Sequence, residues 1–299
     1  IKVPRELHVR AHSGNGDIHI GDGSVQALEV ETKRGSVGCA AKVAAGTHTV
    51  ANGHGDLTLR SVRGDLELKT SAGRIELGET QGSVRAQTGS GDILLRTAMG
   101  AAELQTSHGR IEVGSPRRLQ LRAQTGHGDI QIGDGSLDAL QLQTNAGRVH
   151  CVADLAPGRH ELTTGNGDVV LRMRADANAH LDAQTSFGQI HTDFALVRVG
   201  RSGSMSFNGT RMVGSLGPAE PDVNVVLRTS RGQIELRLKE GVSPRYEPVP
   251  VAPSRAGDQE QSEPRQPEAA QQRDPEHVLT VLRALAEGTL SLEEADALL

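Results

Sequence analysis

Residues 70–111 read TSAGRIELGETQGSVRAQTGSGDILLRTAMGAAELQTSHGRI, in which the pattern Thr-x-x-Gly-x-Ile occurs three times at intervals of 18 residues. Outward from this stretch the pattern continues from Ser13 to Ile234, with a small polar residue in the first position and an aliphatic residue in the last. A repeat of this period indicates one stacked supersecondary unit per repeat. The glycines of the pattern are Gly16, Gly35, Gly55, Gly73, Gly91, Gly109, Gly128, Gly147, Gly167, Gly188 and Gly232.

Each repeat contains two short runs in which apolar and polar residues alternate. Ile75-Glu76-Leu77 follows one glycine, and Leu66-Glu67-Leu68 precedes it. Alternation with period two predicts half-buried strands, and the Gly and Asp residues between the runs predict turns. Because one such unit cannot bury its own apolar face, the units must stack.

We therefore predict an all-β fold, a single-chain parallel β-solenoid (β-helix) of about twelve coils over residues 1–242. We expect a right-handed coil, because parallel crossovers strongly prefer that hand. An antiparallel sandwich is the alternative, but its hairpins do not need an identity period of about 19 residues.

The residue after the pattern glycine alternates in sign from coil to coil. In stacked coils these side chains lie about 4.8 Å apart, where like charges repel and opposite charges attract. Exposed ion pairs contribute only about 0–1 kcal/mol each, so we assign this charge ladder to register and solubility rather than to chemistry. Its members are Asp56, Arg74, Asp92, Arg110, Asp129, Arg148 and Asp168.

The pattern breaks between Phe194 and Pro221, where we expect an irregular coil or protective loop near the C-terminal end of the rod. It then resumes for a last coil at residues 225–238. Open solenoid ends expose sheet edges that need covering, so the irregular stretch argues against end-to-end stacking of rods.

The C-terminal part changes in composition. Residues 243–273 are rich in Pro, Gln and Glu and predict a disordered linker. Residues 274–299 predict a helical hairpin, with an N-cap at Asp274 and a capping box at Ser291–Glu294. A hairpin this small is not stable alone, so we expect it to self-associate with another copy, to dock on the solenoid, or to dock on a different protein partner. The predicted docking positions are Val278, Val281, Leu282, Leu285, Leu292, Leu298 and Leu299.

Composition excludes several classes of function. Aromatic residues make up 1% of the 299 residues, too few for sugar-stacking clefts or base-stacking platforms. Residues 248–299 carry 4 Arg against 10 Asp and Glu, and the rest of the chain is nearly neutral, which disfavours binding to nucleic acid. No stretch approaches the roughly 18 apolar residues of a transmembrane segment. The sequence leaves the compartment open between the cytoplasm and the cell envelope.

Candidate sites for metal ions have simpler explanations. The Gly-Asn-Gly-Asp runs at 14–17 and 165–168 are similar to calcium-binding β-rolls, but Arg replaces the Asp in every other coil, which favours turn chemistry. His108 and His127 occupy the same position of adjacent coils, and His54 holds it three coils earlier. Two imidazoles make a weak zinc or nickel site, so we interpret them as surface turn residues and predict no cofactor.

Two further arrangements concern a possible disulfide and a possible pair of catalytic carboxylates. Cys39 and Cys151 occupy the same inward position six coils apart, about 29 Å, so we predict two buried free thiols and no disulfide. Asp92 and Asp129 lie on one line with Arg110 between them, which fits an ion-pair ladder better than the carboxylate pair of a polysaccharide-cleaving enzyme. We predict no enzymatic activity and no catalytic residue.

Two resemblances cover the chain apart from the linker. Residues 282–295, LRALAEGTLSLEEA, resemble a short helical-hairpin domain with the pattern L-x-x-L-x-x-G-x-I-[ST]-x-E-E-A, which is linked to oligomerisation in bacterial proteins. The Thr-x-x-Gly repeats and the opening Val3-Pro4 resemble the bacterial β-strand-repeat family, a domain of unknown function whose members carry an adhesin label. The resemblance implies no enzymatic activity and supplies no catalytic residues.

The leading hypothesis is a non-enzymatic bacterial scaffold, in which the rod supplies a repeated surface and the tethered hairpin supplies docking or oligomerisation. One alternative is an adhesin-like binding protein of the cell surface or envelope. Another is a self-polymerising solenoid of the bactofilin kind.

Overall fold

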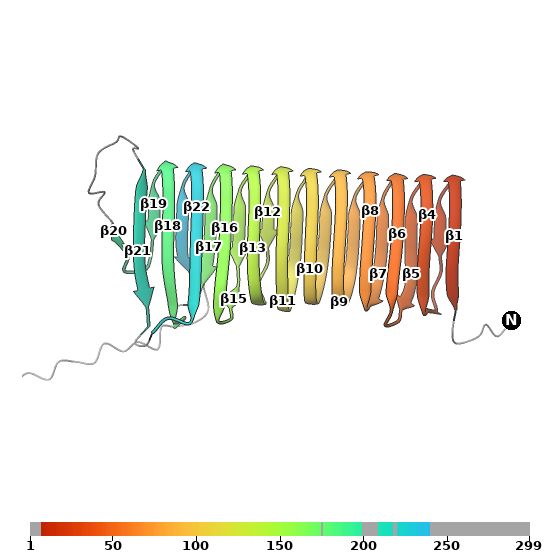
Figure 1. Ribbon diagram of the computed structural model, residues 1–299, viewed down its shortest axis with the longest axis horizontal. Coiled ribbons are helices and arrows are strands. Elements are labelled where there is room, and N and C mark those ends of the chain that lie inside the picture. Colours follow the sequence, from red (N-terminus) through yellow and green to blue (C-terminus); the bar gives the residue numbers. More distant parts are fainter. Residues whose placement is uncertain (1–6, 175, 199–208, 218–219, 240–299) are drawn as a thin grey trace, which may run out of the picture. The chain divides into compact units, whose positions relative to one another are not determined.

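The computed structural model describes residues 7–174, 176–198, 209–217 and 220–239. All of these lie in one compact unit, Ile1–Glu247. Its strands form one continuous sheet that winds into a β-solenoid, which confirms the predicted fold class (Figure 1). The predicted linker at 243–273 and helical hairpin at 274–299 lie outside the described residues.

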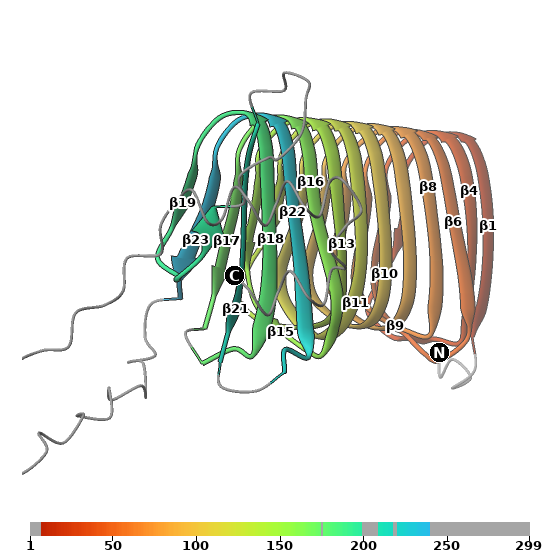
Figure 2. The same ribbon diagram turned by 60° about the vertical axis from the view of Figure 1, so that its left-hand side comes forward.

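The solenoid has two layers of parallel strands (Figures 1 and 2). The front layer of Figure 1 contains, in spatial order, β1 (His8–Asn15), β4 (Ala27–Arg34), β6 (Thr47–His54), β8 (Asp65–Ala72), β9 (Ile75–Ser90), β10 (Ile93–His108), β11 (Ile111–His127), β13 (Ser136–Ala146), β16 (Gly158–Asn166), β22 (Val223–Arg231) and β18 (Ala179–Phe187).

The back layer contains shorter strands. They are β2 (Ile18–Ile20), β3 (Ser24–Val25), β5 (Val37–Val43), β7 (Leu57–Arg63), β12 (Ile130–Ile132), β14 (Val149–Val152), β15 (Asp154–Leu155), β17 (Val169–Met173), β23 (Ile234–Leu238) and β19 (Ile190–Thr192). Strands β9, β10 and β11 turn a corner and belong to both layers, because their first halves pair with back strands and their second halves with front strands.

The core lies between the layers and consists of columns of aliphatic side chains. The aliphatic residue that follows each pattern glycine points inward, and Ile75, Ile93 and Ile111 of this column are fully buried. Each such side chain stabilises the fold by roughly 1.5–3 kcal/mol, so the column continues only while every coil supplies an apolar residue there. The narrow space between the layers accommodates Val, Ile and Leu, in agreement with the scarcity of aromatic residues.

The Thr-x-x-Gly pattern has a direct structural cause. The hydroxyl of Thr106 donates a hydrogen bond of 3.1 Å to the carbonyl oxygen of Gly91 in the preceding coil, and Thr125 does the same to Gly109. The glycine itself adopts a positive φ, +148° at Gly109, and a Cβ there would lie 2.1 Å from the oxygen of Gly91. A side chain at this corner is therefore excluded both by the backbone conformation and by the preceding coil.

The last coil of the sequence is not the last coil of the rod. Strand β22 lies between β16 and β18, and β23 lies between β17 and β19 (Figure 1). The glycine contacts follow the same order, because a Cβ on Gly232 would meet Gly167 and a Cβ on Gly188 would meet Gly232. Residues 223–238 thus form an inserted coil that fills a gap between two coils completed earlier in the sequence.

The irregular stretch forms two antiparallel strands rather than a coil. Strand β21 (Thr210–Leu216) pairs antiparallel with the outward edge of β18, and β20 (Val197–Arg198) pairs antiparallel with β21. The prediction of about twelve coils was therefore too high, and the described part of this stretch agrees with the second alternative, a protective segment, rather than with an irregular coil. Strand β21 covers the otherwise exposed edge of β18, as expected for a protective segment.

Candidate functional site

The predicted charge ladder lies in one row of the solenoid. The Asp92 carboxylate accepts a hydrogen bond of 2.8 Å from the backbone N–H of Arg110 in the next coil, and Asp129 does the same for Arg148. Asp56 has the same partner geometry with Arg74. The arginine side chains reach the following aspartates at 3.4–4.0 Å. Each aspartate thus binds the backbone of the neighbouring coil, which the sequence did not reveal.

A second charged row was missed by the sequence analysis. It lies on the front layer three residues before the pattern threonine, and its sign alternates over four consecutive coils of the middle of the solenoid. Its members there are Glu67, Arg85, Glu103 and Arg122, followed by Gln141 and Glu161. The Arg85 guanidinium donates two hydrogen bonds to Glu103, at 2.6 and 2.9 Å, and this carboxylate raises the pKa of Arg85. Aligning the coils on the pattern threonine reveals this row of charged residues in the sequence.

A groove of about 690 Å³ runs beside this second charged row, across strands β6 to β16. Its hollow arises because the adjacent outward row contains short side chains at Ser83, Ala101 and Ala139, whereas the second charged row has long ones. Buried Val84 and Leu121 lie beneath it. The groove therefore presents alternating carboxylates and guanidinium groups along one side of a shallow channel.

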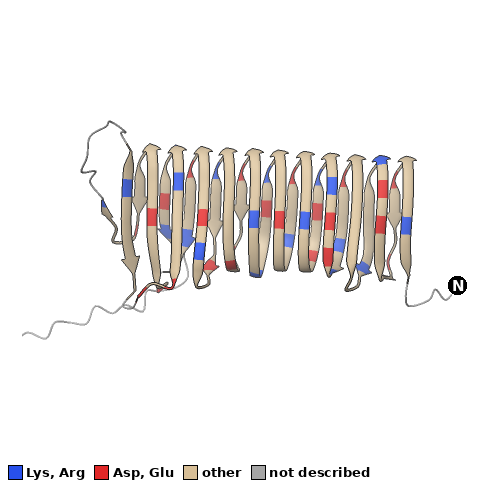
Figure 3. Cartoon of the chain, viewed as in Figure 1, with Lys and Arg blue, Asp and Glu red and all other residues tan. Residues whose placement is uncertain are grey.

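Two more grooves lie on other parts of the surface. One of about 1040 Å³ follows the Thr-x-x-Gly corner of the N-terminal coils, from Gly14 to Ser107, over small and polar residues. The other, of about 490 Å³, is lined by part of the charge ladder together with His150 and Arg172. Burial, followed by the charge of Arg172, lowers the pKa of His150. Positive and negative residues are interleaved along the strands (Figure 3), so none of these grooves has a surface of one sign.

Two histidines take the place of aliphatic residues in the core. His48 and His160 are fully buried, and each ring Nε2 lies 2.8–2.9 Å from the carbonyl oxygen four residues earlier, of Ala44 and Ala156. Burial lowers the pKa of His160. Each histidine closes a longer turn with the sequence Ala-x-Gly-x-His, so its role is structural.

The other candidate residues have the following positions. The rings of His108 and His127 stack at 5.1 Å and are nearly parallel, so their in-plane lone pairs do not converge on one ion. Within the described ranges no group of three or more His, Cys, Asp or Glu side chains could hold a metal ion. Cys39 and Cys151 are buried free thiols in the same inward column, and burial raises the pKa of Cys151 to about 12.

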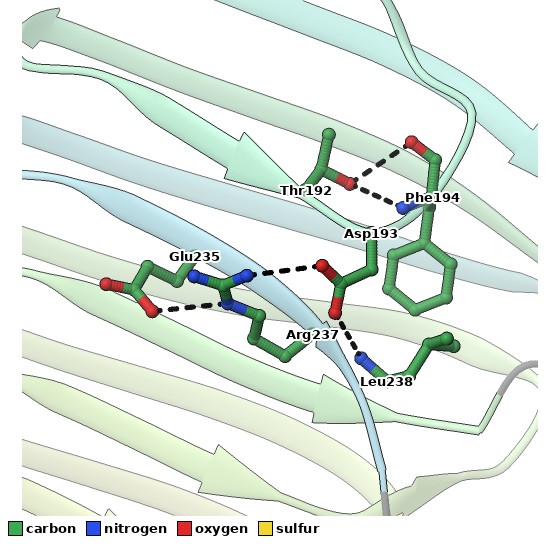
Figure 4. A network of polar contacts seen from close by, with 6 residues as sticks. All are labelled: Thr192, Asp193, Phe194, Glu235, Arg237 and Leu238. Carbon is green, nitrogen blue, oxygen red and sulfur yellow. Dashed lines mark hydrogen bonds and ion pairs between the residues drawn. The ribbon is translucent and has the colours of Figure 1, made fainter.

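A polar network joins the inserted coil to the coil on its outer side (Figure 4). The Asp193 carboxylate accepts a hydrogen bond of 3.2 Å from the Arg237 guanidinium and one of 3.1 Å from the backbone N–H of Leu238. Arg237 also contacts Glu235, and the Thr192 hydroxyl bridges the backbone of Phe194.

On the inner side, the Lys239 ammonium lies 2.6 Å from Asp134 and 3.2 Å from Asp154. Burial acts to lower its pKa, but the hydrogen bonds to the two carboxylates leave the pKa of Lys239 above its usual value. Together the two networks hold the end of the inserted coil from both sides.

The predicted docking residues of the tail, from Val278 to Leu299, lie outside the part of the chain that the structure describes. Among the described residues, no helix is long and apolar enough to cross a membrane.

Comparisons with known proteins agree with the fold. The family model Toastrack DUF4097 matches residues 4–114 and again residues 96–237, which together span almost the whole described solenoid. No curated protein matches, and no solved structure matches. With its repeated Thr-x-x-Gly coils and parallel two-layer winding, the chain belongs to the Toastrack DUF4097 family.

Proposed function

We propose that this protein is a non-enzymatic interaction scaffold, in which the solenoid presents rows of side chains to protein partners and residues 274–299 form a tethered docking or oligomerisation module. The observation that supports this best is the groove beside the second charged row, which presents exposed side chains of both signs. The solenoid buries its own aliphatic columns. The helical hairpin predicted at residues 274–299 is too small to be stable by itself, so its apolar stripe needs a partner.

The solenoid surface suits a binding role. The groove beside the second charged row offers charged groups of alternating sign at the spacing of the coils, about 4.8 Å, and so can attract a protein segment that carries both signs of charge. Its ion pairs are exposed, with 62% of the Arg85 side chain and 43% of the Glu103 side chain accessible. Such pairs contribute about 0–1 kcal/mol, so a partner can replace them at small cost.

The carboxylates that might form a catalytic pair have structural partners instead. Asp92 and Asp129 each accept a backbone N–H of the next coil, and Arg110 lies between them. This arrangement supports a role for them in holding the register of the coils, and the proposal assigns no reaction to the protein.

Light scattering after size exclusion on the full chain tests the proposal. We expect a larger assembly for the wild type than for Leu285→Glu, which places a charge in the predicted apolar stripe. Thr280→Glu adds the same charge off the stripe and should remain oligomeric. If Leu285→Glu and the wild type have the same mass, the tail is not an oligomerisation module. If both are monomers, a partner other than a second copy must occupy the stripe.

A further inference from the structure

The inserted coil fills a slot whose two walls are formed by other coils. On one side β22 and β23 pair with β16 and β17, and on the other side with β18 and β19. The chain makes this slot by stepping over one coil position between Met173 and Ala179. Until residues 223–238 enter, two parallel strand edges face each other across a missing strand.

The inserted coil makes the same kinds of contact with its neighbours as the other coils of the solenoid make with theirs. Thr229 donates to the carbonyl oxygen of Gly167 at 3.0 Å, and Thr185 donates to that of Gly232 at 3.1 Å. The Asp168 carboxylate accepts the backbone N–H of Gln233 at 2.9 Å. The slot therefore selects a coil with the Thr-x-x-Gly pattern through backbone and corner contacts, and none of these depends on which copy of the chain supplies it.

The inward side of the slot requires apolar side chains from the coil that fills it. Val225, Leu227 and Leu236 of the inserted coil are fully buried. Leu227, for example, lies in register between Leu162 of one flanking coil and Ala183 of the other. An empty slot exposes these columns together with two unpaired strand edges, which is the usual template for addition of a strand.

A short hinge leads into the slot. Strand β21 pairs with one edge of β18 and β22 with the other, so that Ala179 faces Leu216 on one side and Val223 on the opposite side. The six residues 217–222 between these strands include Pro218 and Pro221. On the described part of this hinge, Asn178 donates a hydrogen bond of 2.6 Å to the carbonyl oxygen of Glu220. A short hinge of this kind favours exchange of the element that follows it.

We infer that the slot between β16–β17 and β18–β19 is an acceptor site for the β22–β23 coil of a second copy of this chain. Two copies exchange these coils reciprocally and form a dimer whose strand contacts equal those within one copy. The exchange costs only the association of the two copies, because every contact broken in one copy is made in the other. It uses the solenoid alone and does not depend on the proposed role of the C-terminal hairpin.

Disulfide trapping in the full chain tests the exchange. Arg159 and Asn224 are register partners on β16 and β22, and both side chains are exposed. Their parallel backbones lie about 4.8 Å apart, within the range that a disulfide spans. The single variants Arg159→Cys and Asn224→Cys are mixed, unfolded in denaturant, refolded together and oxidised, and the peptides linked between positions 159 and 224 are measured by mass spectrometry.

The matched control is the pair Gln120→Cys and Ala139→Cys. These positions are also exposed register partners in the same outward row, but they lie on β11 and β13, whose coils are consecutive in sequence. The buried Cys39 and Cys151 stay unchanged in all variants.

We expect about tenfold more cross-linked dimer from the 159/224 mixture than from the 120/139 mixture, with a yield that rises with protein concentration during refolding. Equal yields at every concentration overturn the inference. The double variant Arg159→Cys/Asn224→Cys must also close its disulfide in the folded protein. If it does not, the inserted register itself is wrong and the inference fails with it. Hairpin-driven association alone cannot produce the specific 159–224 link.

Discussion

Replacing Gly109 by alanine tests the reasoning about the Thr-x-x-Gly corner most directly. Gly109 lies in the middle of the solenoid with φ +148°, and a Cβ would stand 2.1 Å from the oxygen and 2.6 Å from the carbon of the Gly91 carbonyl. Both atoms belong to backbone, so no side chain can move aside. The two coils must therefore separate locally by about 1 Å to reach ordinary contact distance.

Three hydrogen bonds depend on that spacing. The N–H of Gly91 donates to the carbonyl oxygen of His108 at 2.8 Å, that of Ile93 to the carbonyl oxygen of Arg110 at 2.9 Å, and the hydroxyl of Thr106 to the carbonyl oxygen of Gly91 at 3.1 Å. Losing them costs about 1 kcal/mol each. The backbone conformation adds roughly 1–3 kcal/mol, and the lower entropy of an unfolded alanine offsets about 0.4–1 kcal/mol. We expect Gly109→Ala to lower the free energy of unfolding by about 4 kcal/mol.

Urea unfolding followed by circular dichroism measures this loss, with Gly14→Ala as the matched control. A Cβ at Gly14 has no neighbour within 4 Å and its φ lies outside the left-handed range, so this substitution should change stability by less than about 1 kcal/mol. If Gly109→Ala and Gly14→Ala differ by less than about 1 kcal/mol, the corner does not require glycine for the reasons given.

Four further substitutions or treatments test other parts of the structure. Because burial lowers the pKa of His160, the folded protein resists its protonation while the unfolded chain accepts it below about pH 6.5. Stability should therefore fall as the pH drops through this range, and less steeply in His160→Leu; parallel slopes in urea melts at pH 5–8 would contradict this. Arg118 has φ +48°, so Arg118→Gly should raise the free energy of unfolding by about 0.5–1 kcal/mol, and a lower denaturation midpoint would argue against strain. A double-mutant cycle on Arg85 and Glu103, both partly exposed, should give a small favourable coupling free energy that decreases as salt is added. The Cys151 thiol should react with a thiol reagent only after unfolding, since it is fully buried and its pKa is raised to about 12; rapid labelling of the native protein would disprove this.

The sequence predicts the solenoid well because the same contact recurs in most of the coils. Thr106 binds the Gly91 carbonyl in the same way as Thr125 binds Gly109, so one structural requirement appears many times in the sequence. The inward aliphatic columns repeat for the same reason. Periodicity therefore reveals the winding of the chain, the corner glycines and the inward positions.

The features that occur only once or twice were harder to predict. His48 and His160 replace aliphatic residues in two longer coils, where the ring fills the turn and binds a carbonyl oxygen. Their shared Ala-x-Gly-x-His sequence was visible, but two instances give no periodic signal. The second charged row does repeat in the sequence, three residues before the threonine, and is therefore separate from the charge ladder that follows the glycine.

The place of the inserted coil could not be predicted from the repeat at all. Residues 229–234 carry the same Thr-x-x-Gly-x-Ile pattern as the other coils, and so they satisfy the contacts of any position in the stack. A pattern shared by all coils specifies that a coil stacks and leaves open where it stacks. Sequence order then suggests the end of the rod, and the structure places the coil one position inward.

Specificity for the slot must come from contacts that do not repeat. Asp193 binds Arg237 and Leu238 from the outer side, and Lys239 reaches Asp134 and Asp154 from the inner side. These residues distinguish the slot from other positions in the stack, but they do not distinguish one copy of the chain from another. The same economy that lets a short pattern build a long solenoid thus leaves the identity of the donor chain undetermined, and only the short hinge and the local concentration of chains decide between filling the slot from within and filling it from a second copy.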